Sequence, residues 1–339
     1  MEEILSLRGV VFGEEEKDKL DPRFWGWEFL EGPDGQGLIY VVEDGSKIVG
    51  HFADLPRRFC IQGGVALGTL SLDLMVHPDY WRRGIFEALG RYGTERVKKE
   101  NGLFLIAFPI RPETIHGLKK IGWKEVVKLP VLVYPTRFSG IINRYLHFPL
   151  LSVLAGGVVR LLYLFFYKSK RRIRTEEIET EGMGSLDNQF DHFWRKALSR
   201  YSIIGVRDRN YLTWRYLQHP TRTYTIYRAK QNGEMRGYIV LRKVELLHFN
   251  SAVIVDLLAL DEVALTALVK KGIQYSRQEG TDLLAFMVPQ DHPYNKVLRK
   301  SGFLPSPKTF QFMVYFHSKR EIFNSPENWY VNWGDTDVI

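Results

Sequence analysis

Apolar residues of this sequence recur with two different periods, which alternate along the chain. Continuous apolar runs at 70–76 and 103–109 have the length of buried strands. Between them, Ile85, Leu89 and Tyr92 follow a spacing close to 3.6 residues, which is typical of a helix with one buried face. Strands that alternate with helices predict a mixed sheet covered on both faces. The pattern therefore indicates an α/β protein.

The same order of elements occurs twice, and the aromatic helices that open the two copies are 187 residues apart. The matched pairs are the aromatic helices 24–30 and 211–217 with Trp27 and Trp214, the hairpin turns Asp44-Gly45 and Asn232-Gly233, the buried strands 70–76 and 253–260 with Asp73 and Asp256, the strands 103–109 and 283–289, and the pairs Gly122-Trp123 and Gly302-Phe303. So many matches in one order predict two copies of one α/β unit.

A basic, glycine-containing turn joins the first copy's buried strand to its helix. It reads Val76-His77-Pro78-Asp79-Tyr80-Trp81-Arg82-Arg83-Gly84-Ile85-Phe86. A helix start presents unpaired N–H groups and the positive end of the helix dipole, so it can hold a phosphate. Gly84 would let the backbone approach such a group, and two arginines add positive charge. The turn therefore predicts an anion site.

These residues resemble the acetyl-CoA loop of the GNAT (Gcn5-related) N-acetyltransferase superfamily, whose pattern is Arg or Gln, two residues, Gly, one residue, then Gly or Ala. Gly84 matches this pattern, whereas Trp81 and Phe86 replace the family's Arg or Gln and its second small residue. The Phe108-Pro109 pair and the later Gly122-Trp123 are also similar to this superfamily. The resemblance implies two tandem GNAT-like mixed sheets flanked by helices and joined by an apolar helical linker.

The resemblance also implies the chemistry. A primary amine would attack the thioester of acetyl-CoA, which acts as the acyl donor, and no metal is needed. A backbone N–H of the strand near 74–76 would bind the oxyanion. The acceptor would be a small-molecule or peptide amine: an amino sugar, a small metabolite or a protein lysine. The residues expected to bind the donor are Leu74, Met75, Val76, Trp81, Arg82, Arg83, Gly84, Ile85 and Phe86.

The groups that move protons are less clearly marked. Many relatives have an acidic tyrosine four residues before the Gly-aromatic pair, but here that place holds Leu118. We take Asp73, on the buried strand, as the first candidate for a base, although it would equally suit an ion pair. His116 and Tyr80 are further candidates, and packing roles are the alternative for both.

The second copy lacks the basic turn. Asp261 is predicted to cap the corresponding helix, with Glu262 in its first turn. Acidic side chains there would accept hydrogen bonds from the unpaired N–H groups of the helix start and would repel a diphosphate. We therefore expect a degenerate second copy that does not bind CoA and instead completes the acceptor site.

The repeat leaves the middle of the chain unexplained. Residues 146–167 are almost continuously apolar, and a basic run follows at 168–174. A membrane span is disfavoured because Arg160 lies inside the segment and one crossing would separate the two copies. A helix that packs on both sheets is preferred, and peripheral membrane contact through 146–174 stays open. The predicted domains are 1–136 (acetyl-CoA-binding), 137–200 (apolar and basic linker), 201–317 (degenerate copy) and 318–339 (aromatic and acidic tail).

Composition excludes some classes. One cysteine, Cys60, rules out a disulfide framework, and the scattered histidines and lone cysteine give no zinc-ligand spacing. The acidic start of the chain shows no secretory signal, so a cytoplasmic protein is expected. The net charge of +8 favours an anionic partner without specifying one, and no specific nucleic acid is predicted.

The alternatives to an N-acetyltransferase are a Fem-type ligase that uses aminoacyl-tRNA, and a non-catalytic module whose CoA pocket is blocked by Phe86 or Trp81.

Overall fold

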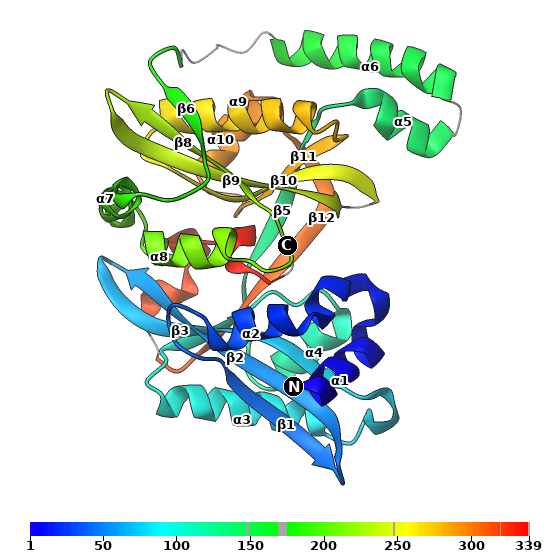
Figure 1. The fold of residues 1–339 in the computed structure, drawn as a ribbon, viewed down its shortest axis with the longest axis vertical. Coiled ribbons are helices and arrows are strands. Elements are labelled where there is room, and N and C mark those ends of the chain that lie inside the picture. Colours follow the sequence, from blue (N-terminus) through cyan, green and yellow to red (C-terminus); the bar gives the residue numbers. More distant parts are fainter. Residues whose placement is uncertain (147–148, 169–174, 247, 319, 338–339) are drawn as a thin grey trace. The chain divides into compact units, whose positions relative to one another are not determined.

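The computed structural model describes residues 1–146, 149–168, 175–246, 248–318 and 320–337. The chain forms two compact units. Unit 1 comprises 1–128, 198–223 and 310–330; unit 2 comprises 129–197, 224–309 and the residues from 331 onward. Each unit contains part of a mixed sheet with flanking helices (Figure 1). The units are discontinuous in sequence, so their limits do not coincide with the sequence-based boundaries at 136, 200 and 317.

Unit 1 contains most of the first copy and two later segments. Its elements are α1 (Glu2–Phe12), α2 (Pro22–Leu30), β1 (Leu38–Asp44), β2 (Lys47–Ile61), β3 (Gly64–Val76), α3 (Ile85–Lys99), β4 (Phe104–Ala107), α4 (Pro112–Lys120), β7 (Ile203–Gly205), α8 (Arg209–Leu212) and β13 (Trp329–Tyr330). β2 pairs antiparallel with β1, β3 and β7, whereas β3 and β4 are parallel. α3 packs on one face of this sheet and α1 on the other, because Phe52 contacts α3 and Met75 contacts α1.

Unit 2 repeats this arrangement. Its elements are α5 (Phe138–Leu146), α6 (Pro149–Lys168), β6 (Glu179–Met183), α7 (Asn188–Ala197), β8 (Thr225–Gln231), β9 (Glu234–Leu246), β10 (Phe249–Ala259), α9 (Glu262–Gln278), β11 (Leu283–Met287) and α10 (Tyr294–Lys300). Both predicted hairpin turns are present. In the second, Asn232 and Gly233 have φ values of 52° and 78°, the left-handed conformation that a tight hairpin turn requires.

Two long strands, β5 (Lys124–Pro135) and β12 (Leu304–Phe316), each begin in one unit and end in the other. In unit 2, the end of β5 pairs with β11, so that Val133 lies opposite Ala285. In unit 1, the end of β12 pairs with β4, so that Met313 lies opposite Ala107. The last strand of each copy therefore completes a sheet built mainly from the other copy.

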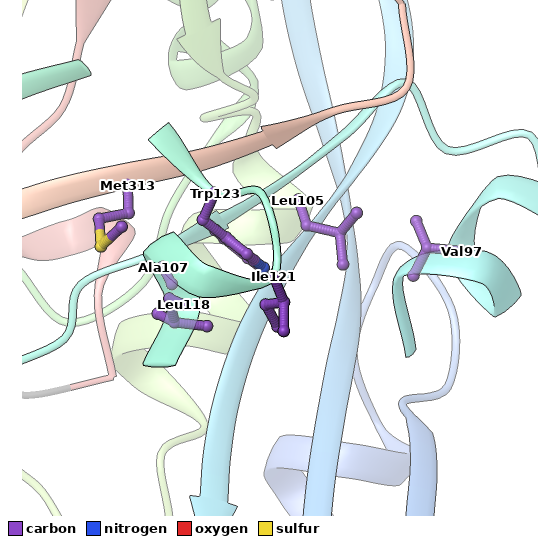
Figure 2. Packing of buried hydrophobic residues seen from close by; sticks show 7 residues of the cluster. All are labelled: Val97, Leu105, Ala107, Leu118, Ile121, Trp123 and Met313. Carbon is purple, nitrogen blue, oxygen red and sulfur yellow. The ribbon is translucent and has the colours of Figure 1, made fainter. Parts of the chain in front are cut away.

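Met313 shows the consequence for the core of unit 1. It is fully buried in a cluster with residues of the first copy (Figure 2). The other members are Val97, Leu105, Ala107, Leu118, Ile121 and Trp123. The first copy therefore lacks a complete core without residues near the end of the second.

The apolar middle segment is helical but is not buried as a whole. Among the side chains of α6 that the structure describes, the large apolar ones that are exposed are Val153, Leu154, Val158, Val159, Leu161 and Leu162. These side chains pack on neither sheet, and the packing of the helix on both sheets stays a prediction. No helix in the described ranges combines the length and the apolar character needed to cross a membrane.

Candidate functional site

A backbone distortion lies in the middle of β3, the buried strand that precedes the basic turn. Asp73 has a φ of 55°, and the pairing of β3 with β2 shifts register between His51 and Ala53. A non-glycine residue in the left-handed region costs energy, so this bulge is held in place by its neighbours. β10 shifts register between Ile254 and Asp256, at the corresponding point of the second copy.

The end of β3 separates from β4. The two strands pair at Thr69 with Leu105 and at Leu70 with Ile106. Within the described residues, β3 then continues to Val76 without pairing to β4. Two parallel strands that part in this way leave unpaired backbone groups, which an extended ligand can engage.

The basic turn leads from this opening to the start of α3. Gly84 is the N-cap residue, with φ 79° and ψ 0°, and no side chain caps the helix. A Cβ added at Gly84 would meet no atom within 4 Å. Neither a side-chain cap nor an atom close to the Cβ position of Gly84 therefore blocks the start of α3 in the described residues, as an anion site at a helix start requires.

The two arginines of the turn have different environments. Arg83 donates to the carbonyl oxygen of Asp79 at 3.1 Å and lies over the Tyr80 ring, 4.7 Å from its centre. Arg82 is exposed, with a φ of 63°, and makes no hydrogen bond or ion pair with any residue that the structure describes. Glu87, in the first turn of α3, is paired with Lys120 of α4, which offsets its negative charge.

The two bulky residues that depart from the family pattern do not fill the space at Gly84. Phe86 packs against α4, where a Cβ on Gly117 would lie only 2.3 Å from its ring. The lack of a side chain at Gly117 therefore makes room for Phe86. The Trp81 indole donates to the carbonyl oxygen of Val76 at 2.9 Å and stays largely exposed.

The bulge residue Asp73 is buried and forms an ion pair with Arg8 of α1. A buried carboxylate needs such a partner, because leaving it unpaired away from water is costly. The structure therefore gives Asp73 the ion pair that the sequence left open as the alternative to a base. The sequence pattern does not mark Arg8, because nothing in the spacing relates α1 to β3.

His51 is a second residue that the sequence did not single out. It is fully buried, and its Nδ1 lies 2.9 Å from the carbonyl oxygen of Asp73. Because a carbonyl oxygen only accepts, Nδ1 carries the proton, and the buried Nε2 has no hydrogen-bond partner in the described residues. Burial lowers the pKa of His51, which keeps the ring neutral.

The repeat contains a signal that would have identified this position. Since Gly50 matches Gly237, His51 matches Tyr238. The Tyr238 hydroxyl donates to Asp256 at 3.1 Å. Asn332 also donates to this carboxylate, at 3.0 Å. In both copies, a polar side chain on the preceding strand therefore binds the aspartate at the bulge.

No hydrogen bond or ion pair in the described residues connects the three predicted catalytic residues with one another. Tyr80 donates to Asp44 at 2.5 Å, and this bond raises the pKa of the Tyr80 hydroxyl. His116 is exposed on α4, and no hydrogen bond or ion pair links it to Asp73 or Tyr80 among the described residues. Leu118, in place of the family's tyrosine, is buried in the core of unit 1. The catalytic roles of Asp73, His116 and Tyr80 stay predictions.

The corresponding helix start in the second copy is closed. Asp261 caps α9, as predicted, and accepts from the N–H of Ala264 at 2.8 Å. Arg236 binds the same carboxyl group at 2.6 Å. Burial opposes the shift, but the hydrogen bonds from the Ala264 N–H and from Arg236 and the charge of Arg236 lower the pKa of Asp261. The start of α9 is thus capped by a carboxylate, which repels an anion, whereas the start of α3 has no side-chain cap.

Unit 1 also has a groove of about 750 Å³ between β1 and α3, lined by Tyr40, Tyr92 and Arg96 among others. Beneath it, Asp54 is completely buried and accepts from Ser71. Burial raises the pKa of Asp54 to about 7. No group of three metal-ligating side chains occurs in the part of the chain that the structure describes.

Comparisons with known proteins agree with this geometry. Residues 1–126 match the family model of the acetyltransferase (GNAT) domain. No curated protein matches the sequence. The fold is similar to a GCN5-related N-acetyltransferase from Anabaena variabilis, with 12% identity, TM-score 0.64, and 92% of this chain and 69% of that chain covered.

Two further solved structures are similar. Saccharomyces cerevisiae N-myristoyltransferase with bound myristoyl-CoA has 11% identity, TM-score 0.59, and coverage of 93% of this chain and 75% of that chain. A tandem GNAT protein from the clavulanic acid biosynthesis pathway has 14% identity, TM-score 0.56, and coverage of 94% and 95%. The chain therefore has a tandem GNAT fold, and its residues 1–126 match the acetyltransferase (GNAT) domain family.

Proposed function

We propose that this protein is an acyl-CoA-dependent N-acyltransferase whose donor site lies in unit 1 and whose donor is acetyl-CoA. The observation that carries the proposal is the uncapped, open start of α3 at Gly84, directly after a strand that parts from its neighbour. The diphosphate would bind at the helix start with help from Arg82. The pantetheine arm would lie along the unpaired end of β3.

In the reaction, the nitrogen of a primary amine attacks the thioester carbonyl. The new N–C bond forms, the C–S bond breaks, and the amine proton is finally transferred to the CoA thiolate. The bulge at Asp73 orients the backbone of residues 74–76, whose N–H groups are the proposed oxyanion donors. His51 would act here as a positioning residue, since it binds the bulge carbonyl.

Calorimetry with acetyl-CoA tests the donor site. Gly84→Asp is expected to weaken binding by about tenfold or more, because its carboxylate would cap the helix and repel the diphosphate. Gly84→Asn has nearly the same shape without the charge and should weaken binding less. Gly280→Asp is the matched control, since Gly280 also has a positive φ, 64°, and open space around its Cβ position.

The outcomes separate the remaining functions. Binding of acetyl-CoA followed by release of free thiol with a panel of primary amines supports an N-acetyltransferase. Tight binding of myristoyl-CoA but not acetyl-CoA would move the proposal to a longer acyl chain. A wild-type protein that binds neither donor contradicts the proposal and favours the Fem-type ligase or the non-catalytic module.

A further inference from the structure

α6 is fixed to unit 2 along one narrow face. Gly156 is buried against α5, where an added Cβ would lie 2.8 Å from the backbone nitrogen of Ser139. The Tyr163 hydroxyl donates to the carbonyl oxygen of Gly302 at 2.6 Å. Gly156 and Tyr163 are seven residues apart and so lie on the same side of the helix. Figure 1 shows α6 lying beside α5.

The opposite side of α6 is apolar and exposed. Leu154, Val158 and Leu161 follow each other at spacings of four and three residues, which places them in one row on the helix. Leu154 is 70% exposed and Leu161 is 69% exposed. Exposed aliphatic side chains gathered in this way mark an interaction surface, because single soluble domains rarely leave such a patch in water.

The charged residues in the sequence segment that contains this helix are all positive. Residues 138–175 contain seven lysines and arginines and no aspartate or glutamate, whereas the whole chain has a net charge of +8. Almost all of the net positive charge therefore belongs to one segment that contains the exposed apolar row. An apolar surface with an excess of cations is complementary to a layer of lipid chains below anionic headgroups.

We propose that the outer face of α6 binds the surface of an anionic lipid bilayer, with the helix lying in the plane of the membrane interface. Leu154, Val158 and Leu161 enter the boundary between headgroups and acyl chains, and the net positive charge of the segment attracts anionic headgroups. The basic run at 169–174 lies outside the described residues and enters only through its charge. The row consists of aliphatic side chains, whereas protein interfaces are enriched in aromatic residues. This inference does not depend on acyl transfer, and neither acyl-CoA nor an amine is needed to test it.

A fluorescent label reports insertion of the helix. Cys60 is the chain's single cysteine and is 1% exposed, so Leu161→Cys supplies one accessible thiol for a polarity-sensitive dye. We expect the emission to shift to the blue with vesicles of phosphatidylcholine and phosphatidylserine. Phosphatidylcholine alone should give a much smaller shift. The matched control is Val65→Cys on β3, which is 64% exposed and should give no shift.

Co-sedimentation of the unlabelled, full-length chain measures the affinity for the same vesicles. The double variant Leu154→Ser and Leu161→Ser should lose at least about tenfold in affinity for the vesicles, because it removes two inserted side chains. Its thermal unfolding should match the wild type, since both residues are exposed. High salt should also weaken wild-type binding on the order of tenfold, by screening the basic residues.

Three results would overturn the proposal. The first is a wild type that does not sediment with the anionic vesicles. The second is a blue shift that depends on protein concentration without vesicles, which would identify a second copy of the chain as the occupant. The third is salt-sensitive binding to duplex DNA that persists in the double serine variant while vesicle binding is absent.

Discussion

The indole rings of Trp27 and Trp214 stack at 4.6 Å with an angle of 16° between their planes. The Trp27 ring N–H donates to the carbonyl oxygen of Trp214 at 3.0 Å, and the Trp214 ring N–H donates to that of Trp27 at 3.3 Å. These residues hold equivalent places in the two copies. The repeated aromatic signature is therefore a reciprocal contact inside unit 1 that joins segments far apart in the sequence.

We expect Trp27→Phe to lower the free energy of unfolding by about 2 kcal/mol, because one hydrogen bond and part of the stacked surface are lost. Denaturant unfolding measures this change. Trp81→Phe is the control. It also loses an indole hydrogen bond, but Trp81 is 61% exposed, so water replaces the bond and the effect should stay within about 0.5 kcal/mol. Equal effects of the two substitutions would show that the reciprocal contact does not stabilise the unit.

The ion pair between Arg8 and Asp73 gives a second prediction. Arg8→Met leaves a buried carboxylate without its charged partner, and the free energy of unfolding should fall by about 3–5 kcal/mol. Adding Asp73→Asn should recover a large part of this loss, because the neutral amide is cheaper to bury. No recovery in the double variant would mean that Arg8 acts through packing rather than through the charge on Asp73.

Asp54 predicts a pH dependence of stability. Its folded-state pKa is about 7, against an ordinary value of 3.8, because burial disfavours the charged form. The unfolded state therefore loses its proton first as the pH rises, and this group lowers stability progressively between about pH 4 and pH 7. Asp54→Asn should remove this dependence and gain up to about 4 kcal/mol at pH 8 relative to pH 4. Thermal unfolding of both proteins across this range checks the slope.

His51 predicts the opposite slope. Burial lowers its folded-state pKa below the ordinary 6.5, so the unfolded state takes up the proton first and stability falls as the pH drops below about 6.5. His51→Asn keeps a donor for the Asp73 carbonyl but does not titrate, and its stability should fall less on acidification. His51→Leu removes both the donor for the Asp73 carbonyl and the titrating ring, so it should lower the turnover number of the proposed reaction. His51→Asn keeps the donor and should retain more of the turnover number. Identical turnover in the two variants would exclude the positioning role.

The sequence alone located the repeated elements that local patterns mark. The hairpin turns, the strands that contain Asp73 and Asp256 and the cap at Asp261 follow from local patterns, because turn chemistry, strand length and helix capping depend on residues close in sequence. The basic turn at Gly84 was visible for the same reason. Its interpretation as a donor site came from family resemblance and from the free helix start.

Contacts between distant segments were not predictable in this way. Met313 enters the core of unit 1 and Arg8 binds Asp73, yet no spacing in the sequence relates these residues to their partners. The repeat places Trp27 and Trp214 at equivalent positions, but it does not show that their rings stack on each other. A repeat shows that two segments share a fold, but it carries no information on which copy each strand completes. The burial of a side chain likewise depends on what packs against it. The raised pKa of Asp54 and the exposure of the apolar row on α6 therefore follow from the tertiary structure. Local chemistry fixed the elements, and the packing of distant residues fixed the charges and surfaces that they present.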